Sequence, residues 1–293
     1  MSDAIRILHG SFGRVALLKL DHSMVLHAHR DCHIVFKVGG PDILFGVGAR
    51  EHAVTAENVL MINAWEPHFY KHRNGPVFTV LLAFYLSPFW LKDVDRRFAQ
   101  STHPKFFTRP MVHPSHRLIQ MRDDVLDSLK QYEPPFTRVI EDLIAAVFAE
   151  IMILTAPLSH LSPVGAHREL GYDARIRQVV QSMLAGAGSP VVMEELARSV
   201  GLSRAHFFRL FQRSTGLAPM TFLNMHRMET CLKSVARREM PLQDIAAQLG
   251  FDTAGNFTRF FAGQQGVTPS KYRKAVGLVD SDKPKSKERW LDK

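Results

Sequence analysis

The sequence predicts a mixed α+β protein of more than one domain, with strands in its first part and helices in its last. Residues 15–20, 33–38 and 77–82 are short runs rich in β-branched side chains, separated by turn-forming Gly, Pro and Asp. From Ser115 onward apolar residues recur at steps of three and four, the period of a helix. The chain has 293 residues, which is enough for two domains, and its 46% hydrophobic content is that of a folded protein.

The strand runs early in the chain predict a small β-barrel or sandwich. Two helices are expected next, over 115–130 and 136–154, and the second is apolar on most sides. A helix of that kind is buried in a core or against a partner. Residues 157–171 are expected to form a linker, and the block 172–275 reads as helical throughout.

Charge is distributed unevenly along the chain. Residues 171–293 hold 19 Lys and Arg against 11 Asp and Glu, a net charge of +8, whereas residues 1–170 have a net charge of +1. The histidines show the opposite bias, because 13 of the 15 lie before residue 171. The basic part is expected to meet a polyanion, and the two parts are expected to have different tasks.

Several classes of protein are disfavoured. No stretch of about 18 uncharged apolar residues exists, so no membrane span is expected, and the N-terminus lacks the apolar core of a signal peptide. The two cysteines, Cys32 and Cys231, lie far apart in the sequence, which excludes a disulfide framework and favours the reducing cytoplasm.

An internal repeat occupies the basic part. Residues 196–203 recur as 245–252 at a shift of 49, and after the turn the shift becomes 50. The second halves of the two copies then align, with Ser203, Phe207, Arg209, Phe211, Gly216 and Pro219 matching Thr253, Phe257, Arg259, Phe261, Gly266 and Pro269. A repeated unit of this length is one supersecondary structure used twice.

Each copy has the features of a helix-turn-helix. Gly201 and Gly250 stand where a first helix ends in a left-handed conformation. Ser203 in the first copy, and Asp252 or Thr253 in the second, are suited to cap the next helix. The second helix of such a motif enters the major groove of DNA, where Arg and Asn side chains read guanine and adenine.

The repeat resembles the DNA-binding domain of the AraC/XylS family of bacterial regulators. The resemblance rests on the second copy, with Gly250-Phe251, Asn256-Phe257, Arg259, Phe261, Gly266 and residues 268–273. A long helix over about 221–238 would join the copies and span roughly 27 Å, so that two recognition helices reach grooves about 34 Å apart on one face of DNA.

The predicted DNA-contacting residues are Arg204, Ala205, Phe208 and Arg209 in the first copy and Ala254, Gly255, Asn256 and Arg259 in the second. The family often has larger polar residues at several of these positions, so direct reading of bases is expected to depend on Arg209, Asn256 and Arg259. Phe208 has simple packing as its alternative, and the two arginines have phosphate contact or a solvated face. Arg213, Lys271 and Arg273 are expected on phosphates or in internal ion pairs.

In many members of this family a cupin-like barrel precedes the DNA-binding domain and senses a small molecule. Here His27-Ala28-His29 resembles the first cupin motif, although His33 stands where enzymatic cupins have a glutamate, and His68 stands in the region of the second motif. The metal ligands predicted on this basis are His27, His29, His33 and His68, for Zn, Ni or Fe. The alternative is a metal-free effector site formed by His27, His29, Trp65 and His68.

These features predict four segments: a cupin-like effector-sensing barrel over 1–112, dimerisation helices and a linker over 113–170, the DNA-binding domain over 171–276 and a flexible basic tail over 277–293. The predicted function is that of a cytoplasmic, homodimeric, sequence-specific transcription regulator controlled by a small-molecule effector, and not of an enzyme. Its expected partners are double-stranded DNA and the effector, with RNA polymerase as a further candidate. The alternatives are a metal-dependent cupin enzyme or metal sensor that carries a DNA-binding module, and an architectural DNA binder without sequence preference.

Overall fold

The computed structural model describes residues 2–72, 77–103, 105–130, 137–155, 173–185 and 191–279. The expected linker over 157–171 lies outside the described residues, as does the tail from residue 280 onward.

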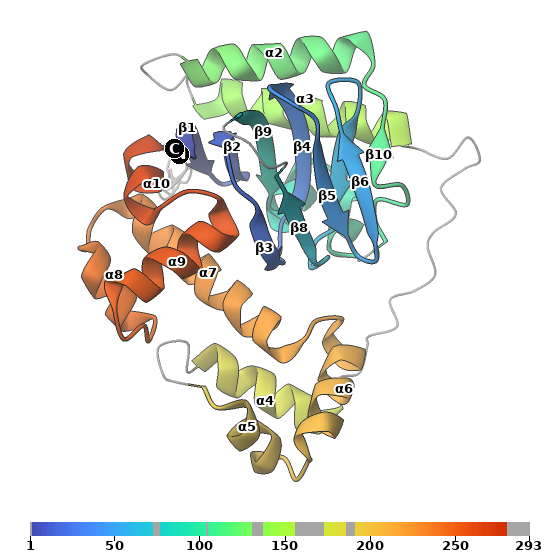
Figure 1. The fold of residues 1–293 in the computed structure, drawn as a ribbon. Coiled ribbons are helices and arrows are strands. Elements are labelled where there is room, and N and C mark those ends of the chain that lie inside the picture. Colours follow the sequence, from blue (N-terminus) through green and yellow to red (C-terminus); the bar gives the residue numbers. More distant parts are fainter. Residues whose placement is uncertain are drawn as a thin grey trace, which may run out of the picture.

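The N-terminal part consists of two sheets (Figure 1). The larger has seven strands in the order β10 (Met111–Val112), β7 (Val59–Ile62), β4 (Cys32–Gly39), β9 (Thr79–Leu86), β2 (Gly13–Leu20), β1 (Asp3–Gly10) and β11 (Val276–Leu278). The smaller has the order β3 (Met24–His27), β8 (His68–Lys71), β5 (Ile43–Val47) and β6 (Arg50–Val54). All neighbouring strands are antiparallel except β1 and β11. The strands expected over 15–20, 33–38 and 77–82 correspond to β2, β4 and β9.

The larger sheet is buried on both of its faces. Along β2, Ala16 and Leu18 join one apolar cluster, whereas Val15 and Leu17 join another. This division follows from the alternation of side chains along a strand. A run that is apolar at successive positions, such as residues 15–18, is therefore typical of a strand covered on both sides.

One face of the larger sheet is covered by helices. After the short helix α1 (Pro88–Val94) and the 3-10 helix η1 (Arg96–Thr102), α2 (His116–Lys130) and α3 (Thr137–Thr155) lie across the sheet (Figure 1). Their buried residues include Leu118, Val125, Ile144 and Phe148, in one cluster with the strand residues. The two predicted helices are thus confirmed. In α3, Val139 and Ile153 remain 57% and 67% exposed.

The C-terminal part is helical. Its elements are α4 (Ala174–Ala185), α5 (Met193–Ser199), α6 (Arg204–Thr215), α7 (Pro219–Arg237), α8 (Leu242–Gln248), α9 (Ala254–Gln265) and α10 (Pro269–Ala275). The long helix α7 runs between the α5–α6 unit and the α8–α9 unit (Figure 1).

The two helix-turn-helix units differ in how they are packed. In the first, Phe207 and Phe211 share an apolar cluster with residues of α4 and α7, to which the N-terminal part contributes Ala28 and the half-buried Trp65. In the second, Phe257 and Phe261 belong to the same apolar cluster as the β2 residue Leu20. The second unit is therefore packed on the N-terminal sheets, and the first is joined to them mainly through α7.

The sequence prediction of a tail beginning at residue 277 was wrong for its first residues. Gly277 and Leu278 are part of β11, which pairs with β1 in parallel, and the backbone N–H of Val279 donates to the carbonyl of His9 at 2.7 Å. The physical reason is that the outer edge of β1 presents unpaired backbone groups, which a following segment of chain satisfies.

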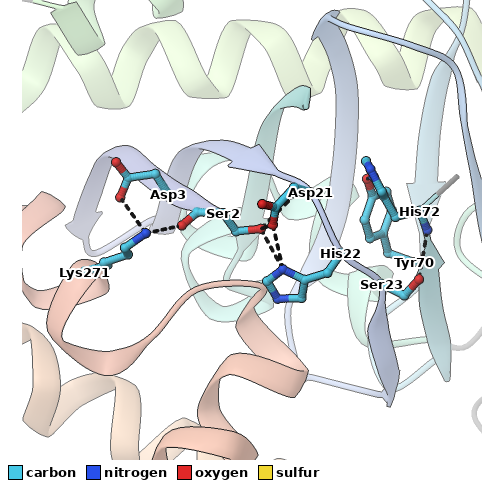
Figure 2. Close-up of polar contacts among 8 residues, drawn as sticks. All are labelled: Ser2, Asp3, Asp21, His22, Ser23, Tyr70, His72 and Lys271. Carbon is cyan, nitrogen blue, oxygen red and sulfur yellow. Dashed lines mark hydrogen bonds and ion pairs between the residues drawn. The ribbon is translucent and has the colours of Figure 1, made fainter. Parts of the chain in front are cut away.

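Polar contacts also join α10 to the first strand, as Figure 2 shows. The Lys271 ammonium donates to the carbonyl of Ser2 and lies 4.0 Å from an Asp3 carboxylate oxygen. The Ser2 hydroxyl donates to Asp21 at 2.7 Å and lies 2.9 Å from Nδ1 of His22. Of the two roles predicted for Lys271, the structure shows the internal ion pair. Among the described helices, none has the length and apolarity that crossing a membrane requires.

Candidate nucleic-acid interface and histidine cluster

Helix α6 is set by local signals in the first repeat. Gly201, in the turn after α5, has a φ of 68°, a conformation that a side chain disfavours. The Ser203 hydroxyl accepts a hydrogen bond from the backbone N–H of His206 and so caps the helix. Gly216 ends it in the left-handed conformation, with its N–H bonded to the carbonyl of Gln212.

Helix α9 repeats this arrangement. Gly250 forms the turn with a φ of 73°, and Gly266 ends the helix with a φ of 71°. Of the two predicted caps, Thr253 acts, because its hydroxyl accepts from the backbone N–H of Asn256 at 3.1 Å. The second copy therefore uses the same caps at the same places.

On α6, Arg204, Ala205 and Arg209 are exposed. The Arg204 guanidinium lies 3.1 Å from a carboxylate oxygen of Glu194 in α5 and 5.3 Å from the centre of the Phe208 ring. Phe208 itself is half-buried and packs on the core of the first unit. Arg209 is exposed, and no ion pair of its guanidinium is found among the described residues.

On α9, Ala254, Gly255, Asn256 and Arg259 are all exposed. The Arg259 guanidinium donates to the side-chain carbonyl of Asn256 at 2.6 Å. Two of the side chains that the sequence predicted to read bases therefore contact each other in this structure. Arg273 makes internal contacts instead, since it donates to the backbone carbonyls of Val235 and Met240.

A hollow of about 500 Å³ extends along the outer side of α6. It is lined by His206, Arg209, Gln212 and Arg213. Two of the four lining residues are arginines, whose guanidinium groups form strong hydrogen bonds with phosphate.

The second site is a cluster of histidines between the two sheets. Ligand-type nitrogens of His29, His33 and His68 lie within 4.8 Å of one another, and all three residues are buried. The rings of His27 and His68 have centroids 4.3 Å apart. The structure therefore brings together all four predicted ligands, with His27 at the margin of the set of three.

Backbone contacts fix the proton positions of this cluster. Nδ1 of His27, of His29 and of His68 lies 2.7, 3.0 and 2.8 Å from the carbonyls of Val25, Asp31 and Glu66 respectively. A carbonyl only accepts, so each Nδ1 carries the hydrogen and each Nε2 keeps a lone pair. The buried Nε2 atoms of His29 and His68, and both ring nitrogens of His33, have no hydrogen-bond partner among the described residues.

The cluster is held neutral by burial. Desolvation lowers the pKa of His27 to about 4, and it lowers the pKa values of His29, His33 and His68 well below the ordinary value. Repulsion between neighbouring imidazoles adds to this effect. Neutral imidazoles that donate through Nδ1 to a carbonyl are the form in which histidine binds a transition metal through Nε2.

Trp65 does not join the histidines, so the residues predicted to bind an effector do not form one group. Trp65 has a φ of 66° and stacks on Phe222 of α7, with ring centroids 6.3 Å apart. The backbone N–H of Trp65 donates to the backbone carbonyl of His29 at 2.8 Å. Trp65 thus connects the backbone beside the cluster with the helix that joins the two DNA-binding units. Left-handed backbone in a bulky residue costs about 1–3 kcal/mol and persists only where the surroundings impose it.

Arg14 of β2 was not singled out from the sequence. Only 5% of it is exposed, and its guanidinium donates to Gln265 of α9 at 2.7 Å and to the Tyr272 hydroxyl of α10 at 3.1 Å. It also lies 3.6 Å from the centre of the Tyr85 ring, which stacks on His33. The available signal was a charged residue directly before the apolar run of residues 15–18.

Comparison with known proteins agrees with this geometry. Residues 196–275 match the family model described as a helix-turn-helix domain. The chain is 30% identical over 141 residues to the RCS-specific HTH-type transcriptional activator RclR of Escherichia coli, covering 48% of this chain and 45% of that protein. It is 25% identical over 173 residues to the Msm operon regulatory protein of Streptococcus mutans, covering 58% of this chain and 60% of that protein. The matches span less than two thirds of these relatives.

The fold has a counterpart among solved structures. An apo form of a variant of ToxT from Vibrio cholerae aligns with a TM-score of 0.52 at 12% identity, covering 90% of this chain and 98% of that one. The two sheets followed by a helical domain with two capped, exposed helices define a DNA-binding protein with an additional N-terminal domain. The C-terminal part therefore contains a helix-turn-helix domain similar to those of HTH-type transcriptional regulators, which agrees with the resemblance to the AraC family that the sequence showed.

Proposed function

We propose that the chain is a sequence-specific transcription regulator that places α6 and α9 in successive major grooves of DNA. The observation that carries this proposal is the pair of N-capped helices, joined by α7, which expose Arg209 on one and Asn256 with Arg259 on the other. Arginine pairs with guanine and asparagine with adenine through two hydrogen bonds each. Ala205, Ala254 and Gly255 would then allow close approach or contact a thymine methyl group, and Arg204 would support Phe208.

The test begins with selection of bound fragments from sheared genomic DNA at about 150 mM salt, where non-specific binding is weak. Arg209→Ala and Arg259→Ala are then measured on the selected site and on a scrambled site. Each is expected to lose about 1–3 kcal/mol of discrimination between them. Arg198→Ala, an exposed arginine of α5, is the matched control and is expected to keep the discrimination. Uniform binding of every fragment, or unchanged discrimination in both variants, would instead support an architectural binder.

We further propose that the N-terminal domain is a cupin-like sensor for a small molecule, and that the protein acts in the cytoplasm as a homodimer. The exposed Val139 and Ile153 of α3 support a contact of this helix with a second copy. One ToxT structure from Vibrio cholerae is bound to (E)-4-(8-methylnaphthalen-1-yl)but-3-enoic acid, and it aligns with a TM-score of 0.51 at 9% identity. This supports an organic effector here, and RNA polymerase is the further partner that a regulator of transcription would contact.

A metal-responsive regulator is the second candidate function. It is supported by the unpartnered lone pairs of His29, His33 and His68, which face one another in a buried space. A set of neutral imidazoles fits Zn²⁺ or Ni²⁺, and a bound ion would supply the partner that these nitrogens lack. His33 occupies the position of the glutamate of enzymatic cupins, which favours sensing over metal-dependent catalysis. The named relatives are likewise transcription regulators.

The metal is tested by titrating purified protein with Zn²⁺ and with Ni²⁺ and following thermal stability. One equivalent is expected to bind and, at 100 times its Kd, to stabilise the fold by about 2.7 kcal/mol. His68→Gln is expected to abolish most of this stabilisation, whereas His52→Gln on β6 is expected to preserve it. An unchanged response in His68→Gln would assign the metal to another place.

A further inference from the structure

A row of polar and aromatic side chains crosses the larger sheet at one register. On β4 and β9, His33 lies opposite Tyr85, and on β9 and β2, Tyr85 lies opposite Arg14. Arg14 in turn lies opposite His9 of β1. Side chains directly opposite one another on neighbouring strands share a face of the sheet. The row therefore runs on one face from the histidine cluster to β1, against which α10 packs.

The next row on the same face is apolar and consists of Val35, Ala83, Ala16 and Ile7. The polar residues thus form a single row within an apolar face. A buried polar row of this kind costs desolvation energy, which its own contacts have to offset.

The contacts along the row are close. The His33 and Tyr85 rings stack with their centroids 4.2 Å apart and their planes inclined by 18°. The Arg14 guanidinium carbon lies 3.6 Å from the centre of the same Tyr85 ring. Both neighbours are too close to the ring centre to share one of its faces, and they come from strands on opposite sides of β9. Tyr85 therefore lies between His33 and Arg14.

Arg14 is the point at which the row meets the second helix-turn-helix unit. Its guanidinium donates to Gln265 of α9 and to the Tyr272 hydroxyl of α10, and Nε2 of His9 lies 2.7 Å from that hydroxyl. Among the described residues, no carboxylate forms an ion pair with Arg14, although the charge of the buried Asp31 acts on it. The row thus ends in a buried positive charge that holds two helices of the C-terminal part.

The Arg14 charge also acts on the histidine cluster. Burial is the largest cause that lowers the pKa values of His29 and His33, and repulsion from the neighbouring imidazoles and from Arg14 adds to it. A positive charge that disfavours a protonated imidazole disfavours a bound cation for the same Coulombic reason. A metal ion in the cluster and Arg14 in its present place therefore oppose each other.

We propose that Tyr85 and Arg14 couple the histidine cluster to the packing of α9 and α10, and that a divalent cation in the cluster loosens this packing. The coupling rests on the metal-responsive function proposed above. Both residues act as positioning residues, because neither belongs to the group of ligand-type nitrogens. Coupling between two sites is reciprocal, so the factor by which the packed helices weaken metal binding is also the factor by which the metal loosens them. Metal binding would thereby give α9 more freedom to align with DNA.

The first test measures the affinity of the full chain for Zn²⁺ by calorimetry at pH 7.5, without DNA. Arg14→Met is expected to bind Zn²⁺ about tenfold more tightly than the original chain, because the opposing charge is gone. Arg14→Lys keeps the charge and is expected to keep the original affinity, as is Arg50→Met on β6. Unchanged affinity in Arg14→Met would overturn the proposal. Weaker binding in both Arg14 variants would also overturn it, because that result is the one expected of a merely structural arginine.

The second test needs no substitution at Arg14 and so remains decisive if Arg14→Met does not fold. Hydrogen exchange is compared in the original chain with and without saturating Zn²⁺. The amide hydrogens of α9 and α10 are expected to exchange about tenfold faster with the metal, whereas those of α5 and α6 are expected to be unchanged. In His68→Gln, Zn²⁺ is expected to have no such effect. Unchanged or slower exchange of α9 and α10 in the original chain would overturn the proposal.

The outcomes separate this coupling from the functions on which it depends. Absence of Zn²⁺ binding from both the original chain and Arg14→Met would overturn the metal-responsive function together with the coupling. Zn²⁺ binding that leaves α9 and α10 unaffected would overturn the coupling alone. DNA selection with the metal-free protein is independent of both results and tests the proposed DNA binding by itself.

Discussion

Replacing Arg14 with methionine is expected to destabilise the protein by about 3–5 kcal/mol. The substitution removes two charge-assisted hydrogen bonds, each worth about 1.5–3 kcal/mol, and leaves the Gln265 carbonyl oxygen without a donor in a buried place. Tyr272 keeps one partner, because its hydroxyl also lies 2.7 Å from Nε2 of His9. The loss of the arginine charge from a buried site offsets part of the cost, and the methionine chain preserves most of the contact with Tyr85.

The measurement is urea unfolding of the full chain, together with hydrogen exchange at β2, α9 and α10. Because Arg14 joins a strand of the N-terminal domain to α9 and α10, faster exchange is expected on both sides of this contact. Arg50→Met, at the exposed first residue of β6, is the matched control. If the two variants unfolded at the same urea concentration, the Arg14 contacts would contribute nothing to docking.

The helix-turn-helix units could be predicted because their determinants are local. Gly201, Ser203 and Gly216 specify the start and end of α6 within a few residues, and the second copy repeats them. The helices over 115–130 and 136–154 could be predicted for the same reason, because the spacing of apolar residues that indicates each helix lies within the helix itself. The alternation of side chains along a strand predicted that His27 and His29 lie on the same side. In the structure β3 ends at His27, so that only His27 belongs to the strand.

The packing of the second unit on the sheets could not be predicted in this way. The apolar side chains Phe257 and Phe261 predict only that a face is buried, and nothing in their spacing says that they share a cluster with residues of the N-terminal sheets. The pairing of β11 with β1 joins residues about 270 positions apart, and three residues give no recognisable pattern. Trp65 looked like part of an effector pocket, but its φ of 66° turns the side chain toward Phe222 of α7.

Acidification is expected to unfold the N-terminal domain between about pH 6.5 and pH 5. Burial and nearby charge lower the pKa of His9 to about 3, and burial lowers the pKa of His27 to about 4 and those of His29, His33 and His68 well below the ordinary value. In the unfolded chain these groups take up a proton near pH 6.5, whereas in the folded chain they do not. The unfolded state therefore binds more protons below pH 6.5, and stability falls as the pH falls through this window.

The expected size follows from the number of histidines involved. Each contributes up to about 1.4 kcal/mol for every pH unit below 6.5, as long as the pH stays above its folded pKa. Five such groups lose several kcal/mol within one pH unit, which is comparable to the whole stability of a domain, about 5–15 kcal/mol. The loss should be absent above pH 7, where both states are unprotonated.

The measurement compares urea unfolding at pH 7.5 with unfolding at pH 5.5, in the original chain and in His33→Gln. His33 has no hydrogen-bond partner on either ring nitrogen among the described residues, so glutamine removes a titrating group without breaking a bond. The variant is expected to lose about 1.4 kcal/mol less than the original chain over this pH interval, and His52→Gln is expected to lose as much as the original chain. Equal losses in all three proteins would mean that the cluster is already protonated or solvated in the folded state.

The histidine lone pairs that resist protonation are also those offered to a metal. Bound Zn²⁺ should therefore move the acid transition to lower pH in the original chain and not in His68→Gln.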